Sequence, residues 1–484
     1  MNFFKASLVI LYVIIIGYGL IRVLLRDKNF FSIYGYIPVS FVAGFSLLAF
    51  WANWAMLAGL RLSFLLLALP LLPLFIYGLT WLDLRLDFHQ LVKKIRSLRA
   101  PELVLILVIL FGIGSVFLMS IVFPMFFTDS RAIWAIKAKL LYGEKTIFSP
   151  SFLDPFRIQP HFRYPLLYPL SQAFIYFALG EADDWAVMLL VGLFFPLLVL
   201  FIYELLRKAT GDRERALLGA AVLAVLPLFF ISDGSAHSGY ADTPLSLFFL
   251  VSFGLIFLWR KTKDDRLLVI GSSLSAFLLL VKNEGLLLWI LNLTWAVWPE
   301  RICLEDSVWR KAFRNLAFFI LAAMVVIIPW ILLKGNIPNA QDESYVKLIS
   351  LNTLAQNFDR VPVIVSFIIY GLLGTQPTMS GLRFLWGGLW LLVVFALVQS
   401  AIRRNWAGIA LFCTLALFIS FMIPIYMITP NNDNDYGMVT NFFRLCMPMT
   451  PLAIMLVVMQ TEKPVIQHNI FYLIRKLLKS LKSS

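Results

Sequence analysis

Long apolar segments alternate with short polar ones along almost the whole chain, and their length fits a lipid bilayer. Segment 103–124 is mostly apolar, and about 20 such residues let a helix cross roughly 30 Å of hydrocarbon. Lipid offers the backbone no hydrogen-bond partner, so each segment is expected to be a helix. The pattern predicts an all-α polytopic membrane protein with about thirteen spans, near 7–25, 34–57, 61–82, 102–124, 186–206, 216–232, 243–259, 266–281, 285–299, 314–333, 384–402, 407–428 and 446–461.

Two further apolar segments, 164–180 and 361–376, are predicted not to be full spans. The first is rich in proline, and the second is short and interrupted by Gly371 and Gly374. Proline and glycine weaken a continuous helix. We expect both segments to be helices of the outer loops that lie at the interface or dip partway into the membrane.

The basic residues predict the orientation of the chain, because cytoplasmic loops carry an excess of Lys and Arg. With thirteen spans and an outer N-terminus, 27 of the 41 Lys and Arg and 13 of the 27 Asp and Glu lie inside. The inner side then carries the whole net charge of +14, and the outer side is neutral. The basic clusters placed inside are 22–28, 85–99, 207–215, 260–266, 301–314, 403–404 and the tail 463–482.

Composition agrees with a membrane protein and excludes several other classes. The chain is 61% hydrophobic and 14% charged, with a mean hydropathy of +0.85, whereas soluble domains are about a quarter charged. Its three cysteines are far apart and predict neither a disulfide framework nor a zinc site. The first apolar segment lacks a small-residue cleavage motif, so we interpret it as a retained helix. Because the positive charge follows topology, no nucleic-acid partner is expected.

The polar residues of unusual type gather in the predicted outer loops. Asp129 follows a span directly and precedes the amphipathic stretch 132–142, whose Lys137 and Lys139 lie near Trp134 and suit the headgroup layer. Asp129 either caps this amphipathic helix, as Asp often does, or has a catalytic or substrate-binding role. The sequence alone leaves both interpretations open.

Later in the same loop, 125–185, basic and aromatic residues follow one another. Such a run at the interface can bind anionic lipid headgroups, and the alternative is an ordinary solvated loop. The residues concerned are Asp154, Arg157, His161, Arg163 and Tyr164.

Two shorter outer loops hold ionisable residues between apolar segments. Asp233, His237, Tyr240 and Asp242 crowd into loop 232–243. Asp242 could cap the next helix, and a His with two Asp could hold a metal, but a third clear ligand is missing.

The turn Lys282-Asn283-Glu284 lies at the join of two apolar segments. Ionisable residues at such places are rare unless they are paired or functional. Either Lys282 and Glu284 simply pair across a tight turn, or the turn belongs to a site.

The last outer loop is rich in acids and amides at 431–436 and lacks the glycine and glutamate of an EF-hand, which argues against calcium. Arg444 enters the final span just before Pro448. A guanidinium there is suited to a phosphate, since its planar fork makes two charge-assisted bonds.

Taken in order, these motifs resemble a known family. The series TDSRAIWAIKAKLLY, RYPLLYPLSQA, SGYADTPLSLFF, VKNEG and NFFRLCMP is similar to the GT-C superfamily of membrane glycosyltransferases. Within it, the resemblance is to bacterial proteins like glycosyltransferase family 39, the relatives of dolichyl-phosphate-mannose protein mannosyltransferases. It covers roughly residues 100–460. The domain division that follows is three N-terminal helices in 1–100, a GT-C-like core in 101–462 with outer loops 125–185 and 334–383, and a basic cytoplasmic tail in 463–484.

The resemblance implies a plasma-membrane enzyme of the cell envelope with its active site on the extracytoplasmic face. It would pass a sugar from a polyprenyl-phosphate carrier to a glycan, lipid or protein acceptor, with inversion expected for a single displacement. Asp129 matches the family's acidic residue in the first outer loop, although Ser130 and Arg131 follow where many relatives have a second acid. No cofactor is expected. The substrate-binding residues expected besides catalytic Asp129 are Arg131, His161, Arg163, Tyr164, His237, Tyr240, Asp242, Lys282, Asn283, Glu284 and Arg444.

Two other function classes remain as alternatives. A polytopic transporter predicts charged residues near the bilayer midplane and inverted repeats, and neither is evident here. A polysaccharide polymerase or ligase also acts through outer loops, and only the ordered motifs favour the polyprenyl-phosphate-sugar transferase over it.

Overall fold

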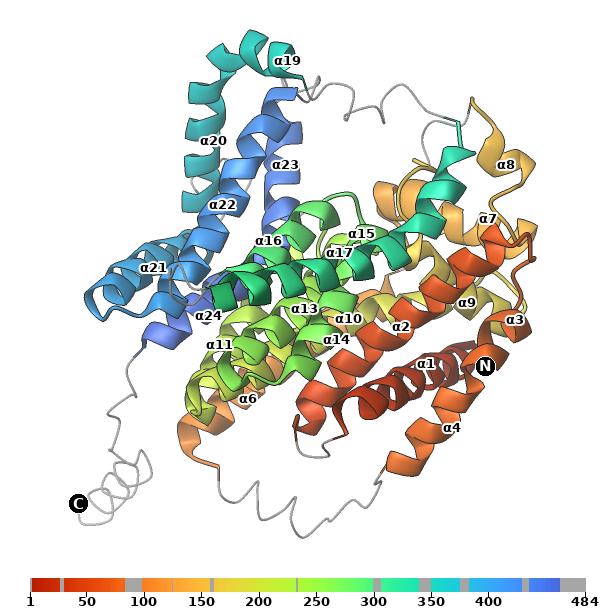
Figure 1. Ribbon diagram of the computed structural model, residues 1–484, viewed down its shortest axis with the longest axis horizontal. Coiled ribbons are helices and arrows are strands. Elements are labelled where there is room, and N and C mark those ends of the chain that lie inside the picture. Colours follow the sequence, from red (N-terminus) through yellow and green to blue (C-terminus); the bar gives the residue numbers. More distant parts are fainter. Residues whose placement is uncertain are drawn as a thin grey trace, which may run out of the picture.

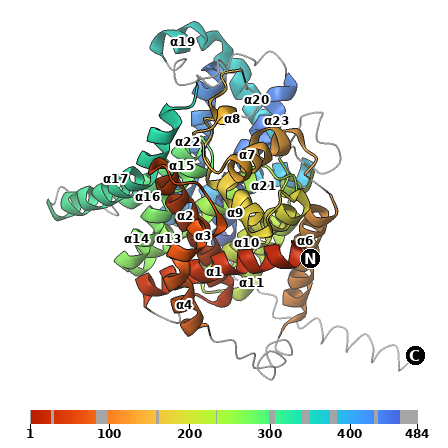
Figure 2. The ribbon, with the colours of Figure 1, turned by 90° about the vertical axis from the view of Figure 1, so that its right-hand side faces the viewer.

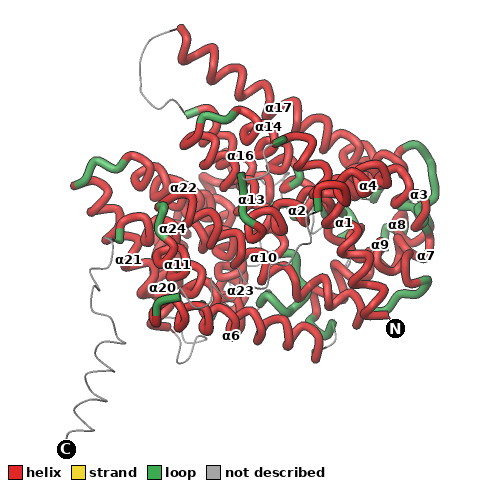
Figure 3. Tube along the Cα trace, turned by 90° about the horizontal axis from the view of Figure 1, so that it is seen from below, coloured by secondary structure: helices red, strands yellow, loops and turns green. Residues whose placement is uncertain are grey.

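The computed structural model describes most of the chain. The described residues are 2–26, 30–82, 98–123, 125–156, 161–231, 234–298, 306–338, 350–374, 383–428 and 435–461. Within them the regular structure is helical, as the apolar pattern predicts (Figure 3).

The helices follow one another with short connections. Those of the first half are α1 (Asn2–Leu25), α2 (Ile33–Leu57), α3 (Phe64–Ala68), η1 (Leu69–Leu71), α4 (Leu72–Trp81), α6 (Ala100–Val122), η2 (Ser130–Ala135), α7 (Ile136–Glu144), α8 (Pro150–Leu153), α9 (Leu167–Leu179), α10 (Asp184–Thr210), α11 (Arg213–Val225) and α12 (Leu228–Ile231). Those of the second half are α13 (Asp242–Thr262), α14 (Asp265–Ala276), α15 (Leu278–Val281), α16 (Gly285–Val297), α17 (Asp306–Gly335), α19 (Leu351–Gln356), η4 (Phe358–Arg360), α20 (Val361–Leu373), α21 (Arg383–Ile402), α22 (Trp406–Ile428), α23 (Asp435–Cys446), η5 (Met447–Met449) and α24 (Thr450–Gln460).

Ten helical segments in the described part of the chain are long and apolar enough to cross a membrane. They coincide with ten of the thirteen predicted spans and establish a multi-pass membrane architecture. The predicted spans 216–232, 266–281 and 285–299 are instead interrupted or short helices. The first is broken before Pro227, where an extended Leu226 ends α11, because proline disfavours the helical conformation of the residue before it.

Local sequence signals set many helix ends. Asp183 and Asp212 cap α10 and α11 by accepting hydrogen bonds from backbone N–H groups of the first turn, as Asp does at N-caps. Gly180, at φ 80°, ends α9. These signals lie in the loops and turn the chain back into the bundle.

Helices α10 and α13 form the centre of the bundle, and α6 and α17 lie at opposite edges of it (Figure 3). Every residue in the most apolar window of α13 is buried, against 17% in that of α6 and 33% in that of α17. A helix that is apolar all round and yet exposed fits contact with lipid, so α6 and α17 are expected to face the bilayer.

The N-terminal helices α1 and α2 pack tightly against each other and contact this centre. A Cβ at Gly17 of α1 would collide with the backbone carbonyl of Ser40, and one at Gly44 of α2 with that of Val13. Small residues let membrane helices approach closely in this way. Both helices also contact α9 and α10 (Figure 1).

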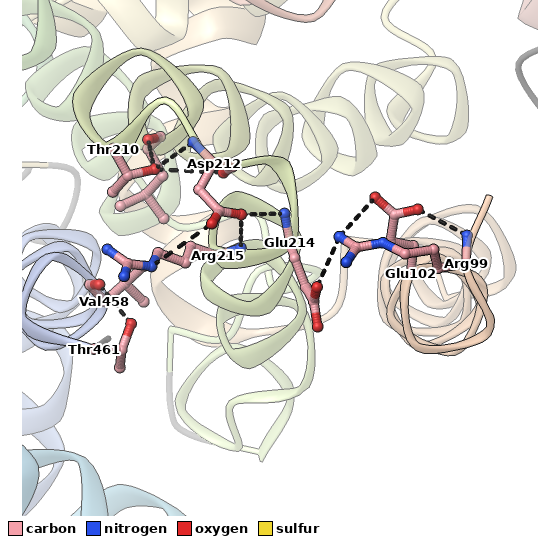
Figure 4. Close-up of polar contacts among 9 residues, drawn as sticks. Arg99, Glu102, Thr210, Asp212, Glu214, Arg215, Val458 and Thr461 are labelled. Atoms are coloured by element: carbon pink, nitrogen blue, oxygen red, sulfur yellow. Dashed lines mark hydrogen bonds and ion pairs between the residues drawn. The ribbon is translucent and has the colours of Figure 1, made fainter. Parts of the chain in front are cut away.

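An ionic cluster joins α6 to α11 at the end of the bundle where both helices begin (Figure 4). Arg99 Nη2 lies 2.8 Å from Glu214 Oε2, and the backbone N–H of Arg99 donates to Glu102 Oε2 at 2.8 Å. Asp212 accepts from the backbone N–H of Glu214 at 2.9 Å. The cluster holds the start of α6 against α11.

Helix α20 and the adjoining ends of α22 and α23 project from the bundle at the upper left of Figure 1, and α20 and α23 lie in the upper part of the molecule again in Figure 2. The predicted non-spanning segments are α9 and α20, each of thirteen residues. The first ten residues of α9 are buried, so most of this helix is covered by protein and not by headgroups.

Candidate functional site

A continuous chain of ion pairs links side chains from separate helices and loops. Arg444 Nη1 lies 3.0 Å from Asp129 Oδ2, and Arg444 Nε lies 3.3 Å from Asp242 Oδ2. Lys282 Nζ lies 2.9 Å from Asp242 Oδ1 and 2.9 Å from Glu284 Oε1. The structure therefore brings together five of the residues that the sequence singled out.

Asp129 lies where the chain turns from α6 into η2. The backbone of η2 is a π-helix, a wide helix that is rare and often found at functional sites. The Asp129 side chain makes no capping hydrogen bond to η2, so the capping interpretation is wrong. Its carboxylate, 31% exposed, points to Arg444 instead.

Asp242 is the first residue of α13 and also does not cap it. The N-cap residue is Ala241, whose side chain makes no capping hydrogen bond. The Asp242 side chain is 2% exposed and uses one oxygen for Lys282 and the other for Arg444. Burying a carboxylate is costly unless it is paired, and here two cations compensate it.

The Lys282–Glu284 pair expected from the sequence exists, but it is part of a larger network. Lys282 is 8% exposed and sits between two carboxylates. Burial opposes its charge, yet Asp242 and Glu284 outweigh that effect and raise the pKa of Lys282. The ammonium is thus a fixed positive charge. Asn283 is exposed and does not take part in the pairs.

Arg444, from α23, is held by more than its two acids. Its guanidinium carbon lies 4.5 Å from the ring centroid of Tyr240, and a partly buried cation over an aromatic face is stabilised by about 0.5–2 kcal/mol. Gly234, at φ 81°, lies against the stem, since a Cβ there would be 2.9 Å from Arg444 Cγ. The role of Gly234 was not evident from the sequence beyond its capacity for tight turns.

A small pocket adjoins the ion pairs and combines charged and apolar walls. Its charged residues are Asp242, Lys282, Glu284 and Arg444. Its apolar walls come from α13, α16, α22 and the α23–η5 segment and comprise Leu245, Leu288, Phe418, Leu445 and Pro448. These apolar residues were not predicted, because nothing in an apolar helix distinguishes a pocket wall from a core position.

His237 and Tyr240 pack against Phe127 beside the ion pairs. Their ring centroids lie 5.7 and 6.1 Å from that of Phe127. Burial lowers the pKa of His237, so its imidazole is neutral near pH 7. No partner hydrogen-bonds its buried Nδ1 in the described part of the chain.

A second cluster, in segment 125–185, surrounds Lys137. This side chain is fully buried, with its ammonium 4.6 Å from the Trp134 ring centroid and 5.4 Å from that of Tyr164. Lys137 Nζ also donates to the carbonyl of His161 at 3.2 Å, and His161 stacks on Tyr164 at 4.9 Å. The expectation that Lys137 lies among headgroups is wrong, because α7 packs on α9 and encloses it.

Arg163 and Arg131 are not members of the ion-pair chain. Arg163 donates to the carbonyl of Ile337 at 2.6 Å and so ties the loop to the end of α17. Arg131 is exposed on η2. Arg157, Asp233 and residues 431–434 lie outside the described residues.

Neither metal ligands among the described residues nor the comparisons with known proteins assign a further role to this site. Among the described residues, no three His, Cys, Asp or Glu side chains are grouped so that they could hold a metal ion. In the comparisons with known proteins, no family model, no curated protein and no solved structure matches the chain. The class that fold and site define is a multi-pass helical membrane protein with a partly buried ionic network beside a small pocket.

Proposed function

We propose that this protein is a membrane glycosyltransferase that moves a sugar from a polyprenyl-phosphate carrier to an acceptor on the extracytoplasmic side. The observation that carries the proposal is the ion-pair chain Asp129–Arg444–Asp242–Lys282 next to a pocket with apolar walls. Two cations, a partly exposed carboxylate and an apolar surface are what a lipid-linked sugar phosphate requires. The ordered motifs that resemble the GT-C superfamily support the same function.

The chemistry assigns a role to each group. The acceptor hydroxyl oxygen attacks the anomeric carbon, and the bond from that carbon to the phosphate oxygen breaks. Asp129 takes the hydroxyl proton, for which a carboxylate must come within about 2.6–3.2 Å. The polyprenyl phosphate leaves with the electron pair. Arg444 and Lys282 stabilise its charge, as preorganised cations do for developing anions, and one displacement inverts the anomeric centre.

The topology belongs to the proposal as well. We place the short helices α14–α15 and α16 and the broken α11–α12 across the membrane, which gives thirteen crossings. The site then lies at the outer boundary, and the basic loops lie in the cytoplasm. A plasma membrane with an external carrier pool is the setting that this arrangement fits.

A transfer assay with purified protein in nanodiscs tests the function. A panel of polyprenyl-phosphate sugars is offered with envelope extract as acceptor, and labelled product is scored. Asp129→Asn is expected to lower turnover by at least about a hundredfold with unchanged folding. Glu181→Gln, which removes an acid in the same loop region and outside the site, is expected to leave it unchanged. Near-normal turnover in Asp129→Asn would remove Asp129 as the base.

A further inference from the structure

The carboxylate proposed as the base is already engaged by a cation. Asp129 Oδ2 accepts from Arg444 Nη1 at 3.0 Å. An N–H that donates to Asp129 cannot donate the same bond to a phosphate, and an acceptor hydroxyl cannot reach Oδ2 while Arg444 covers it. A phosphate that takes this Nη1 bond therefore competes for it with Asp129.

Arg444 can exchange that bond without leaving its place. Its Nε remains bonded to Asp242 at 3.3 Å, its guanidinium rests on the Tyr240 ring, and its stem lies against Gly234. Because the guanidinium is a rigid plane, it stays in place, and the Asp129 carboxylate turns away instead.

The charge balance also permits the exchange. Asp242 is 2% exposed and stays paired with Lys282 throughout, so no buried carboxylate is left without a cation. Asp129 is 31% exposed and can be solvated once it is released. Arg444 lines the pocket, whereas Asp129 is not among its lining residues. The phosphate thus approaches the guanidinium from the side of the pocket, whereas Asp129 contacts it from outside the pocket.

We infer that Arg444 holds Oδ2 of Asp129 until a phosphate monoester or diester reaches the guanidinium from the side of the pocket, takes the Nη1 bond and frees that oxygen for the acceptor. This inference rests on the proposed function and extends it to an order of events. The donor binds first, and Oδ2 of Asp129 becomes available only afterwards. An acceptor that arrives alone meets a carboxylate whose Oδ2 is already engaged by Arg444.

Binding of farnesyl phosphate, measured by calorimetry with the full chain in nanodiscs, tests the exchange. Because Asp129 competes with the phosphate, Asp129→Asn is expected to bind it about tenfold more tightly than the wild type. Glu181→Gln serves as the charge-matched control and is expected to bind as the wild type does. Unchanged or weaker binding in Asp129→Asn would overturn the inference.

A double-mutant cycle separates a direct exchange from a general gain of positive potential. In an Arg444→Met background, Asp129→Asn should give no gain, because the shared guanidinium is absent. A tenfold gain that persists there would overturn the inference. If Arg444→Met does not fold, Arg444→Lys replaces it, and the gain should shrink, because one ammonium lacks the fork.

Inorganic phosphate, titrated in parallel, distinguishes the source of the anion. Tighter binding of farnesyl phosphate supports a lipid-linked ligand, and equal affinity would overturn that part of the inference. The outcome is separable from the proposed function. If Asp129→Asn binds farnesyl phosphate more tightly but the wild type transfers no sugar, the transferase proposal is refuted and the exchange is supported. If the wild type transfers sugar efficiently but Asp129→Asn binds no more tightly, the exchange is refuted and the transferase proposal is supported.

Discussion

Lys282 Nζ lies 2.9 Å from Asp242 Oδ1, and the two side chains are 8% and 2% exposed. The residues are 40 positions apart in the chain and fix the turn before α16 to the start of α13. Breaking a buried pair by removing one partner costs about 3–5 kcal/mol, whereas replacing both partners by apolar residues costs much less.

Lys282→Met is therefore expected to lower the free energy of unfolding by about 3 kcal/mol, because it leaves Asp242 with Arg444 as its only cation in the network. The double variant Lys282→Met/Asp242→Leu is expected to recover more than half of the loss. Unfolding in mixed micelles by titration with dodecyl sulfate measures both. A double variant less stable than Lys282→Met would contradict the pairing.

Gly234→Ala is expected to weaken donor binding through Arg444. The matched control is Gly180→Ala, because Gly180 has φ 80° and Gly234 φ 81°, but a Cβ at 180 has no atom within 4 Å. Both variants should lose about 1 kcal/mol of stability from the left-handed backbone. Only Gly234→Ala should raise KM, measured as transfer against donor concentration. Equal kinetics in the two variants would show that the 234 backbone does not position Arg444.

Acid is expected to destabilise the wild type through His237. Burial lowers the pKa of His237 in the folded protein, whereas the unfolded value is about 6.5. The unfolded state thus binds the proton more readily, so stability is complete above about pH 6.5 and is lost as the pH falls toward the folded pKa. Melting curves between pH 7 and pH 5 should drop less steeply in His237→Gln. Parallel curves would argue against this assignment.

Cysteine labelling is expected to place the ionic site outside. After replacement of the native cysteines, single cysteines are introduced at the exposed Phe156 and Glu181 and at Lys263, between α13 and α14. A membrane-impermeant maleimide should label the first two in intact cells and the third only after permeabilisation, because the basic loops stay inside. Labelling of position 156 only after permeabilisation would show the opposite topology and would refute the proposed extracytoplasmic site.

Much of the fold was accessible from sequence because its signals are local. Hydropathy located ten helical segments that the structure shows as long apolar helices, and glycine and proline marked the shorter helices α9 and α20. The break in span 266–281 falls at Phe277, without a breaker residue, whereas span 216–232 contains Pro227. There a helix-breaking proline interrupts an apolar run, and hydropathy alone does not show whether the helix continues through it.

Lys137 shows how a local pattern can mislead. Its spacing from Trp134 predicts a surface helix in the headgroup layer, and the contact between the two side chains is present. The other side of the contact comes from Tyr164 and from α9, which the sequence pattern of α7 does not contain. A cation–π pair looks the same in sequence whether lipid or protein covers it.

By itself, the sequence determined that this chain is a helical membrane protein and which loops between apolar segments hold its ionisable residues, because the length and polarity of a segment decide whether it can enter lipid. Only the tertiary structure decided the partners. Asp129 and Arg444 are 315 positions apart, and Asp242 can serve as a cap or as the centre of an ion-pair chain with the same neighbours in sequence. Burial settled that choice, because a carboxylate withdrawn from water must find cations wherever the packing of the helices brings them.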